Sequence, residues 1–506
     1  RARRLLPALA FMLVTTAIVV GIWAPDTIKR FAIDTPFALT GTMNWWLVAR
    51  QQDYFESIGR PPLLQHTWSL AVEAQFYLVW PLILYFILKR LGKNRIPFAA
   101  LLIAAASGIT LLFVSLSLDS SNTSKVSHIY FGTDTHSIGL FLGAALAVSW
   151  IPQNFTTSLT KQAQNFIDGV GIFGFIGILA TFLLIDETKP TLYKIAFPLA
   201  ALFGAAIIMS VVHPASRFAP ILENPVLLWI GQRSYAIYLW HWIIFQVTRP
   251  TVDLAGQTWA LYSLRILIVF ALADISLRYV EMPIRRGALK YWFKGLKYRT
   301  KRERTRQTRF FTGVFCFVLA LAAVVSVRAI SIGNEQRAAI EKSLSTPEKP
   351  LTKTTEGGIW LTGDSVILGI RTELNEVAPV SLINARIGRQ ASELLDVMKH
   401  DKAQAGNSPV IFNLGNNGVL SKEIVKEIFE LVKNQPSAIV VNTAVPRPWR
   451  EGNNAIVAQI ARQYSNIRVI DWNSLSNGHP EYFAPDGVHL VPAGVRAYVS
   501  EIKKYL

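Results

Sequence analysis

Three side chains that together perform acyl transfer occur in the last third of the chain. Ser365 stands in GIWLTGDSVILGI, directly after Gly363 and Asp364, while Asp486 and His489 lie three residues apart in APDGVHL. A neutral serine is a poor nucleophile and needs a neighbouring base. A histidine can take the serine proton while an aspartate fixes the tautomer and orientation of the imidazole. We therefore expect a catalytic site with Ser365 as nucleophile, His489 as base and Asp486 as its orienting partner.

Such a site also needs donors for the oxyanion that develops on the attacked carbonyl. Two further segments could provide them: NARIGRQ with Gly388, and LGNNG with Asn417. Glycine lets a backbone N–H approach the oxyanion closely, and the Asn417 amide would add a second donor beside the Ser365 N–H. Taken singly, GDS, GNNG and an Asp-x-x-His pair each occur in ordinary turns. Their occurrence together and in this order favours the catalytic interpretation.

The order of these residues and the pattern around them indicate the fold. Serine precedes aspartate and histidine, which excludes the chymotrypsin and subtilisin orders, and Ile367 replaces the second glycine of a G-x-S-x-G elbow. Short β-rich runs alternate with amphipathic segments from about residue 356 onward. This alternation predicts a parallel sheet with helices on both faces. The expected strands are GIWLTG, PVIFNLG, AIVVNTAV and IRVIDW, and the expected helices are SKEIVKEIFELVKN and NAIVAQIARQYS.

The residues before this domain are those of a multi-pass membrane protein. Hydrophobic residues make up 51% of the whole chain, a share that is too high for an ordinary soluble enzyme. The formal net charge is +18. We expect a membrane domain at 1–330 with about nine spans, because apolar runs of bilayer length recur along it. The spans are expected at 5–23, 69–88, 97–117, 137–151, 168–185, 194–212, 225–247, 257–280 and 310–330.

Three basic blocks predict the orientation of these spans. They are RARR at 1–4, KRLGKNR at 89–95 and a long Lys/Arg-rich run at 285–309, and such blocks stay cytoplasmic. An even number of crossings must separate the first two blocks. The Trp-rich segment FALTGTMNWWLVA at 37–49 is therefore expected as a re-entrant or interfacial element on the outer side.

The same count places the end of the chain outside the cell. The span at 310–330 leads outward from the last basic block. Residues 331–355 are polar, contain two prolines and are expected as a linker. The domain at 356–506 is then extracytoplasmic.

Polar residues inside the apolar spans indicate a second site, because such residues are costly there and usually functional. Glu73 lies in HTWSLAVEAQFY, His136 in TDTH, and Tyr238 and His241 in GQRSYAIYLWHW. Tyr238 and His241 are three residues apart and share a helical face. Each residue alone also fits a structural role, since Tyr and His anchor membrane interfaces and a glutamate can cap a helix. Their occurrence in three spans favours a functional group of residues in the outer half of the membrane.

These motifs carry two resemblances to known families. The blocks with Ser365, Gly388, Asn417 and His489 resemble those of the SGNH (GDSL-like) hydrolase fold over residues 356–506. TWSLAVEAQFY, TDTH, GQRSYAIYLWHW and RYVEMPIRR resemble motifs of the membrane acyltransferase-3 family, from residue 1 to about 290. A chain that joins the two resembles bacterial O-acetyltransferases of peptidoglycan and surface polysaccharides.

The resemblance implies a donor, an acceptor and a location. An acetyl group would come from cytosolic acetyl-CoA, cross the lipid bilayer of the cell membrane and reach a hydroxyl of a cell-surface glycan. No metal is expected, and no nucleic-acid-binding motif occurs. Two departures stand out. The family begins with a helix pair bearing an Arg and a His, whereas this chain begins with RARRLLPALAFML, so we expect it to be truncated at the N-terminus. The TDT motif commonly continues with Arg, and here His136 follows, which leaves its role open.

Two other functions fit part of this pattern. A membrane-tethered esterase would use the same serine site with water as acceptor, but the membrane residues would then have no purpose. A transporter with an outer binding domain would leave the Ser-Asp-His set idle. The single cysteine, Cys316, excludes an intramolecular disulfide framework in either case.

Overall fold

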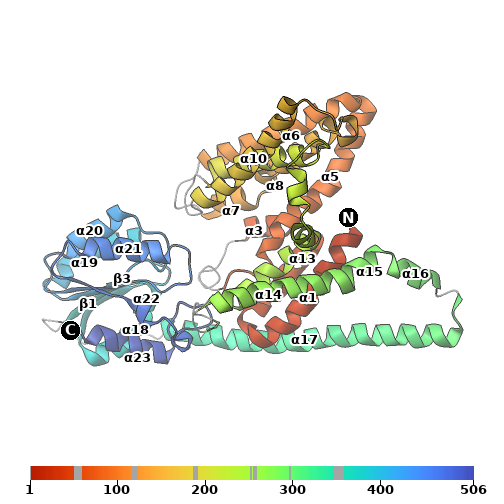
Figure 1. Cartoon of the computed structure of the whole chain (residues 1–506). Helices are drawn as coiled ribbons and strands as arrows, with labels where there is room; N and C mark the ends of the chain where they lie inside the picture. The colour runs from red at the N-terminus through yellow and green to blue at the C-terminus, as the bar shows by residue number, and fades with distance from the viewer. Residues whose placement is uncertain are drawn as a thin grey trace.

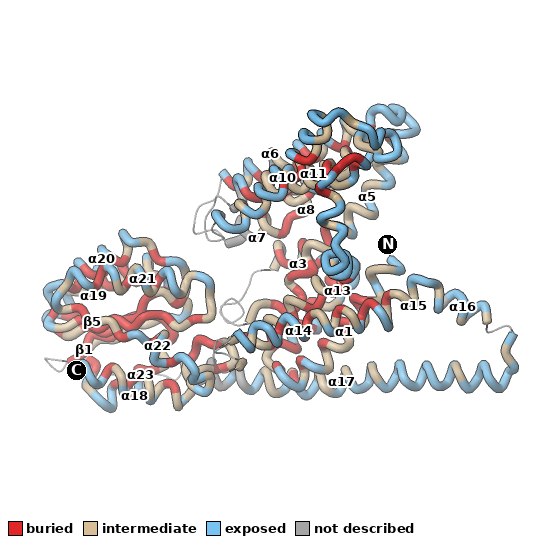
Figure 2. The backbone as a smooth tube through the Cα atoms, viewed as in Figure 1, coloured by how far each residue is buried: buried red, intermediate tan, exposed pale blue. Residues whose placement is uncertain are grey.

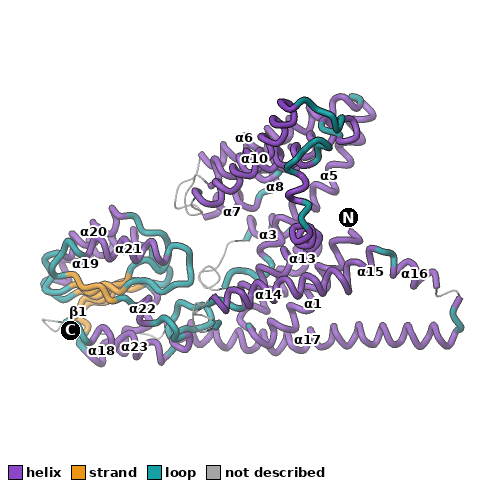
Figure 3. The backbone as a smooth tube through the Cα atoms, viewed as in Figure 1, coloured by secondary structure: helices purple, strands orange, loops and turns teal. Residues whose placement is uncertain are grey.

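The chain folds into two parts of different architecture. The computed structural model describes residues 2–50, 60–116, 123–185, 192–250, 253–254, 259–295, 298–345 and 358–506. A helical part comes first, and a smaller α/β domain lies at the C-terminal end (Figure 1). The strands drawn in Figure 3 all belong to the α/β domain. A single long helix, α17 (Lys301–Ser345), runs along the helical part and reaches the α/β domain.

Seven helices among the described residues are long and apolar enough to cross a membrane. They are Ala2–Trp23, Gln65–Arg90, Lys93–Leu116, Lys161–Leu184, Lys194–Val211, Trp259–Arg285 and Lys301–Glu335. Each coincides with a predicted span. The two other predicted spans are helical as well: α9 (Ile138–Ser149) is apolar but has 12 residues, and α13 (Pro225–Val247) has 23 residues and several polar side chains. The multi-pass helical fold is as predicted, and the count of nine spans stays a prediction.

The helical part is built from these helices and several shorter ones. In chain order they are α1 (Ala2–Trp23), α2 (Ile28–Thr40), α3 (Met43–Ala49), α5 (Trp68–Arg90), α6 (Ile96–Leu116), α7 (Thr123–Phe131), α8 (Thr133–His136), α9, α10 (Lys161–Leu184), α11 (Phe197–Val211), α12 (Ala219–Leu222), α13, α14 (Trp259–Ile275), α15 (Met282–Arg285) and α16 (Ala288–Gly295). A π-helical turn at Ser276–Glu281 joins α14 to α15.

The outside of the helical part is apolar where a soluble protein would be polar. Large side chains such as Phe98, Phe113 and Phe182 are exposed. Figure 2 shows α17 exposed along most of its length, although its middle is one of the apolar segments of membrane-spanning length. An exposed apolar surface of this extent on helices long enough to span is what contact with lipid requires.

Glycines let α10 and α11 pack closely. A Cβ at Gly174 would lie 2.7 Å from the main-chain oxygen of Phe203, and one at Gly177 would lie 2.5 Å from the Phe203 ring. Small residues at such positions allow van der Waals contact between helix backbones, which is the main attraction between helices in lipid.

The Trp-rich segment at 37–49 forms the end of α2 and the whole of α3, separated by a turn at Gly41. Helix α3 has seven residues, which is too short to cross the hydrocarbon core. The Gln75 side chain on α5 holds this turn by donating to the Gly41 oxygen at 3.0 Å and to the Asn44 side-chain oxygen at 2.9 Å. The re-entrant or interfacial placement on the outer side stays a prediction.

Helix α17 extends into the predicted linker at 331–355. The helix has 45 residues and continues to Ser345, so the first part of that segment is helical, and its role as a linker stays a prediction. The sequence SIGNEQRAAIEKSLS is polar but contains Glu, Gln, Arg, Ala and Lys, which favour helix, and the first proline comes later, at Pro347. Residues 346–355 lie outside the described part of the chain.

The α/β domain is a five-stranded sheet in the order β2-β1-β3-β4-β5, with every neighbouring pair parallel. Helices cover both faces, with α19, α20 and α21 on one face and α18 and α23 on the other (Figure 1). This is the predicted architecture. The elements are β1 (Ile359–Gly363), α18 (Ser365–Val377), β2 (Val380–Ala385), α19 (Ala391–Ala405), β3 (Val410–Asn413), α20 (Lys422–Val432), β4 (Ala438–Val441), α21 (Arg450–Ala461), β5 (Ile467–Ile470), α22 (Trp472–Leu475) and α23 (Pro492–Lys503).

All four named strands occur where the sequence predicted them, as β1, β3, β4 and β5. Strand β2 was not among them. It lies at the edge of the sheet and only its first residue is buried, so its sequence, VSLINA, lacks the continuous apolar run of its neighbours.

Candidate active site

The sheet order brings two of the predicted site segments to one edge. The chain passes from β1 to the edge strand β2 and returns to β3 on the other side of β1. Ligands of such sheets bind in the crevice beyond the carboxyl ends of the strands where the order reverses. Ser365 follows β1 after the single residue Asp364 and is the first residue of α18, and Asn417 follows β3. The predicted nucleophile therefore lies at the switch point of the sheet.

The turn before Ser365 requires a glycine. Gly363 has φ of 154°, and a Cβ there would lie 2.3 Å from the Asn413 side-chain oxygen and 2.6 Å from Ile367. The Asp364 carboxylate then caps α18 by accepting the Val366 N–H at 2.9 Å. These contacts turn the chain sharply and fix Ser365 in the first turn of the helix.

Asp364 is the centre of a buried polar network that sequence reasoning did not assign. Its carboxylate accepts hydrogen bonds from the side-chain amides of Asn413 at 2.7 Å, Asn416 at 3.0 Å and Asn417 at 3.0 Å. Burial raises the pKa of Asp364 above its usual value, and these donors oppose the rise. The network ties the turn before Ser365 to the loop after β3.

Asp486 and His489 form the predicted pair. The Asp486 Oδ2 lies 2.7 Å from the His489 Nδ1, and its Oδ1 accepts the main-chain N–H groups of Val488 at 2.8 Å and of His489 at 3.0 Å. Burial opposes ionisation of Asp486, but the hydrogen bond and charge of His489 hold its pKa below the usual value. A carboxylate at Nδ1 favours the tautomer with the proton on that nitrogen, in which Nε2 is the nitrogen that can act as general base.

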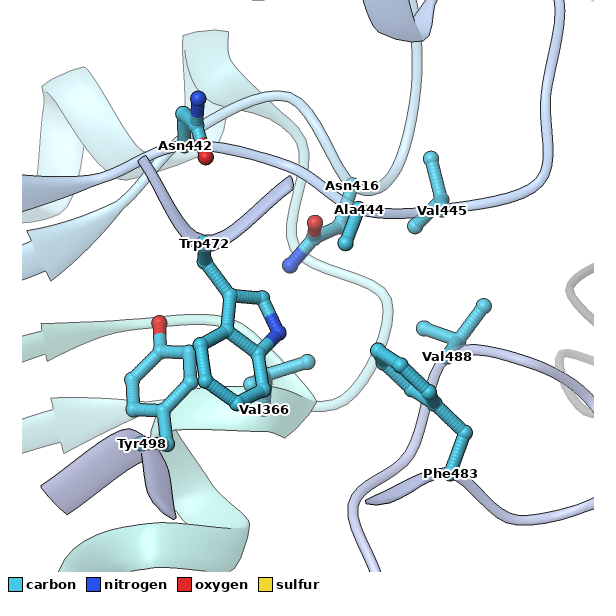
Figure 4. A pocket seen from close by; sticks show the side chains of 9 residues that line it. All are labelled: Val366, Asn416, Asn442, Ala444, Val445, Trp472, Phe483, Val488 and Tyr498. Carbon is cyan, nitrogen blue, oxygen red and sulfur yellow. The ribbon is translucent and has the colours of Figure 1, made fainter. Parts of the chain in front are cut away.

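The segments that carry Ser365 and His489 face the same pocket. Val366, directly after the serine, and Val488, directly before the histidine, both line it. Figure 4 shows Val366 beside Trp472 on one side and Val488 beside Phe483 on the other. The complete lining is Val366, Asn416, Asn442, Ala444, Val445, Trp472, Phe483, Val488 and Tyr498. Mostly apolar walls with a few polar groups are typical of small-molecule sites.

The two predicted oxyanion donors are placed differently from each other. Gly388 lies in the loop after β2 with φ of 73°, a conformation that glycine adopts readily. The Asn417 side-chain nitrogen donates to Asp364 at 3.0 Å and to the main-chain oxygen of Arg389 at 3.2 Å. In this geometry both amide hydrogens of Asn417 are used within the protein. Its role as an oxyanion donor stays a prediction that requires the amide to turn.

Arg389 holds the loop of Gly388 against the turn before Ser365, and sequence reasoning missed it. The guanidinium is largely buried and donates to the Gly363 oxygen at 3.1 Å and to the Asn384 side-chain oxygen at 2.8 Å. Burial, and then the charge of Arg386, lowers its pKa. The available signal was an arginine directly after a glycine at a strand end, which is weak because exposed arginines occur there as well.

In the helical part, the structure brings Tyr238 and His241 together with a third residue, His66. The Tyr238 hydroxyl donates to the His66 main-chain oxygen and shares a 2.6 Å hydrogen bond with Ser69. The His66 and His241 rings have centroids 5.8 Å apart, and each lies within 5.6 Å of the Tyr238 ring. The His241 Nδ1 donates to the Tyr238 oxygen at 2.7 Å, which leaves its Nε2 with a lone pair. We call His66, Tyr238 and His241 the membrane cluster.

His66 was missed although it begins the motif in which Glu73 was singled out. Its Nε2 donates to the Leu239 oxygen on α13 at 3.1 Å. Glu73 accepts a hydrogen bond from the hydroxyl of Tyr77 at 3.3 Å.

His136 packs against aromatic rings near the membrane cluster. The centroid of its ring lies 5.0 Å from that of Trp68 and 4.7 Å from that of Phe197. Trp68 begins the helix that also carries Glu73. The catalytic roles of Glu73, His136, Tyr238 and His241 stay predictions. Within the described part of the chain, no three His, Cys, Asp or Glu side chains are grouped so that they could hold a metal ion.

A multi-pass helical part and an α/β domain with the Ser365 turn at its switch point define a membrane protein with an enzyme domain. The chain belongs to the acyltransferase-domain family, whose model matches residues 1–278, and it is an O-acyltransferase. It is 29% identical to the peptidoglycan O-acetyltransferase OatA of Listeria monocytogenes, covering 99% of this chain and 86% of that protein.

A second relative and one solved structure are also similar to the chain. The chain is 30% identical to the O-acetyltransferase OatA of Staphylococcus aureus, covering 100% of this chain and 85% of that protein. Among solved structures, the C-terminal catalytic domain of peptidoglycan O-acetyltransferase A of Streptococcus pneumoniae matches 29% of this chain and 91% of that domain. The identity is 25% and the TM-score is 0.26.

Proposed function

We propose that the chain takes acetyl groups from cytosolic acetyl-CoA and transfers them across the cell membrane to hydroxyls of an extracytoplasmic glycan. The acceptor would be peptidoglycan, which the name of the Listeria monocytogenes relative contains, or another cell-surface polysaccharide. Acetyl-CoA does not leave the cytoplasm, so an enzyme that acetylates outside the cell must relay the acyl group. A membrane part that carries the acyl group outward, joined to a serine site that passes it to the glycan, would meet this requirement.

Ser365 receives the acetyl group in the first half of the reaction. Its Oγ attacks the carbonyl carbon of the delivered acetyl group and its proton passes to the His489 Nε2. The tetrahedral intermediate then collapses, the bond to the delivering group breaks, and that group leaves with the proton. The product is an acetyl ester on Ser365.

The second half reverses these roles. A sugar hydroxyl attacks the acetyl carbonyl while His489 takes its proton, the ester bond to Ser365 breaks, and the proton returns to the Ser365 Oγ. The glycan leaves with an O-acetyl group. Water in place of the sugar would turn the same site into an esterase.

One observation carries the proposal. The Asp486 carboxylate and the His489 imidazole are paired at 2.7 Å through Nδ1, on a loop whose Val488 lines the same pocket as Val366 beside Ser365. Such a pairing prepares Nε2 as a base. A binding domain has no need of it, so a transporter with an outer binding domain does not explain this geometry.

The membrane cluster supports the transfer step. His241 and Tyr238 lie in the C-terminal half of α13, which the positive charges place toward the outside. An imidazole nitrogen with a lone pair, such as the His241 Nε2, can accept the proton that an acceptor hydroxyl must lose, or can itself carry an acetyl group.

The test is glycan acetylation by the full chain in bacterial cells that have no other O-acetyltransferase. Acetate released from purified glycan by mild base measures transfer. Ser365→Ala should abolish it, and Ser465→Ala, at an exposed serine in the turn between α21 and β5, should not. Glycan acetylation at the parent rate in Ser365→Ala would refute the acetyl-enzyme. If the parent chain instead lowers the acetyl content of pre-acetylated glycan, the protein is a membrane-tethered esterase.

A further inference from the structure

One side chain of the helical part touches the loop that carries the catalytic pair. The Nη2 of Arg249 donates a hydrogen bond to the main-chain oxygen of Pro485 at 2.8 Å. Arg249 follows the end of α13 by two residues, and Pro485 directly precedes Asp486. The contact therefore joins the outer end of a helix in the membrane part to the loop of Asp486 and His489, although 236 residues separate the partners along the chain.

Arg249 is held in place by a neighbouring carboxylate. Its Nε donates to the Asp253 Oδ2 at 2.9 Å and its Nη2 to the Asp253 Oδ1 at 3.0 Å, a two-point pairing that fixes the plane of the guanidinium. Arg60, from another segment, donates to both oxygens of the same carboxylate. Its Nη2 lies 2.8 Å from Oδ1, and its Nη1 lies 2.9 Å from Oδ2. Burial opposes ionisation of Asp253, but Arg249 and Arg60 hold its pKa below the usual value. The orientation of the Arg249 guanidinium is therefore set by groups of the helical part, independently of its contact with the α/β domain.

The segment around Arg249 is also fastened to the helical part. The Trp23 Nε1 on α1 donates to the Val247 oxygen at 3.0 Å. Arg265 on α14 donates to the Phe245 oxygen at 3.0 Å and to the Thr248 hydroxyl at 3.1 Å. The C-terminal end of α13 would otherwise have unsatisfied carbonyl groups. These bonds make Arg249 a fixed extension of α13 rather than a loose surface arginine.

The same helix carries the membrane cluster. His241 precedes Val247 by six residues, which is about 9 Å along a helix axis. A fixed element therefore connects Tyr238 and His241 to the loop of Asp486 and His489.

We propose that Arg249 is a positioning residue that docks the catalytic loop on the outer end of α13, so that Ser365 stands where acetyl leaves the membrane part. The inference rests on the proposed acetyl transfer. Arg249 touches neither acetyl group nor acceptor. Its loss would leave the serine site able to react with a small soluble ester but poorly placed to receive acetyl from the membrane side.

The test compares two activities of the full-length chain. Arg249→Ala should lower glycan acetylation in cells at least tenfold. Hydrolysis of nitrophenyl acetate by the same purified chain in detergent should change less than about twofold. Arg249→Lys keeps one cation that can donate to Pro485 and should recover part of the transfer. Arg468→Ala, an exposed arginine on β5, is the matched control and should leave both activities unchanged.

A distance measurement separates docking from general stability. With Cys316 replaced by serine, spin labels at Trp259→Cys on α14 and Ser500→Cys on α23 should give a narrow distance distribution that broadens in Arg249→Ala. Unchanged transfer, or an unchanged distribution, would overturn the proposal. Loss of both activities in Arg249→Ala and Arg249→Lys would overturn it too, since Arg249 would then support the site itself. Failure of the acetyl-enzyme is seen separately, in Ser365→Ala.

Discussion

The Oδ2 of Asp486 lies 2.7 Å from the Nδ1 of His489, and both residues belong to one four-residue loop. The second carboxylate oxygen is occupied as well, by the N–H groups of Val488 and His489. The pairing is thus built locally, and both oxygens must be acceptors. An amide at position 486 has only one acceptor and would turn a donor toward either the ring or the main chain.

Asp486→Asn should therefore lower turnover of nitrophenyl acetate by about 10³–10⁴-fold, as expected when the orienting carboxylate of a serine site is lost. The physical reason is the tautomer, because an amide nitrogen facing Nδ1 favours the proton on Nε2, where no base would remain. Steady-state hydrolysis by the purified chain measures the effect. Asp396→Asn, an exposed aspartate on α19, is the control. A loss of less than tenfold in Asp486→Asn would contradict the assigned role.

The pKa of Asp486 also predicts a dependence of stability on pH. A carboxyl group whose folded pKa is lowered contributes stability that is present above its unfolded pKa of about 4 and is lost as pH falls through the folded value. Parent and Asp486→Asn chains should differ by a constant amount above about pH 5, and the difference should shrink below about pH 4. Hydrogen exchange over residues 358–506, corrected for intrinsic rates, measures it.

Asp364 provides the opposite case. Burial raises its pKa, so its favourable contribution is present below the unfolded value and declines as pH rises through the folded value. The parent chain should lose stability relative to Asp364→Asn over that interval. An equal dependence of stability on pH in the parent chain and in Asp364→Asn would contradict the raised pKa of Asp364.

The amides after β3 allow a test of the oxyanion donor. Asn416 and Asn417 both donate to Asp364 at 3.0 Å, so loss of either weakens the turn before Ser365 to a similar degree. If Asn417 also turns toward the oxyanion, Asn417→Ala should cost roughly 10²–10³-fold in kcat, with a far smaller effect of Asn416→Ala. Equal losses in the two variants would assign Asn417 to the support of Asp364 alone.

The sequence was sufficient for the features that follow from local rules. Four strands are continuous apolar runs, and residues at the carboxyl ends of parallel strands meet at one edge, so the placement of Ser365 and Asn417 could be predicted. The Asp486–His489 pairing needs only three residues of separation. Strand β2 was not predicted because a half-buried edge strand lacks such a continuous apolar run.

Features that depend on distant partners could not be predicted. The His66 ring is held by a hydrogen bond to the Leu239 oxygen, 173 residues away. Arg389 is held by a hydrogen bond to the Gly363 oxygen, 26 residues away. Polar composition suggested a linker after residue 330, yet the helix of α17 continues to Ser345. Polarity reports exposure, and an exposed helix is as polar as an exposed loop.

The orientation of the chain can be tested with its single cysteine removed. In a Cys316→Ser chain, Ser465→Cys in the α/β domain should react with a membrane-impermeant thiol reagent in intact cells. Lys301→Cys, within the basic block, should react only after the membrane is opened. Labelling of Lys301→Cys in intact cells would reverse the predicted topology and with it the extracytoplasmic placement of the serine site.

The membrane cluster makes the last prediction. The Tyr238 hydroxyl bonds the His66 oxygen and Ser69, and the His241 Nδ1 bonds the Tyr238 oxygen, so removal of either side chain disturbs the other. Tyr238→Phe and His241→Ala should each abolish glycan acetylation in cells and leave nitrophenyl acetate hydrolysis by the purified chain unchanged, because the serine site is intact. Glu73→Gln should behave likewise.

A matched control for these variants is Tyr85→Phe, an exposed tyrosine on α5, which should transfer acetyl normally. Glycan acetylation at the parent rate in Tyr238→Phe and His241→Ala would remove the cluster from the pathway. Loss of ester hydrolysis as well would mean that the cluster acts through the fold of the whole chain. Transfer lost with hydrolysis kept separates the two halves of the reaction, since only delivery of acetyl through the membrane would then fail.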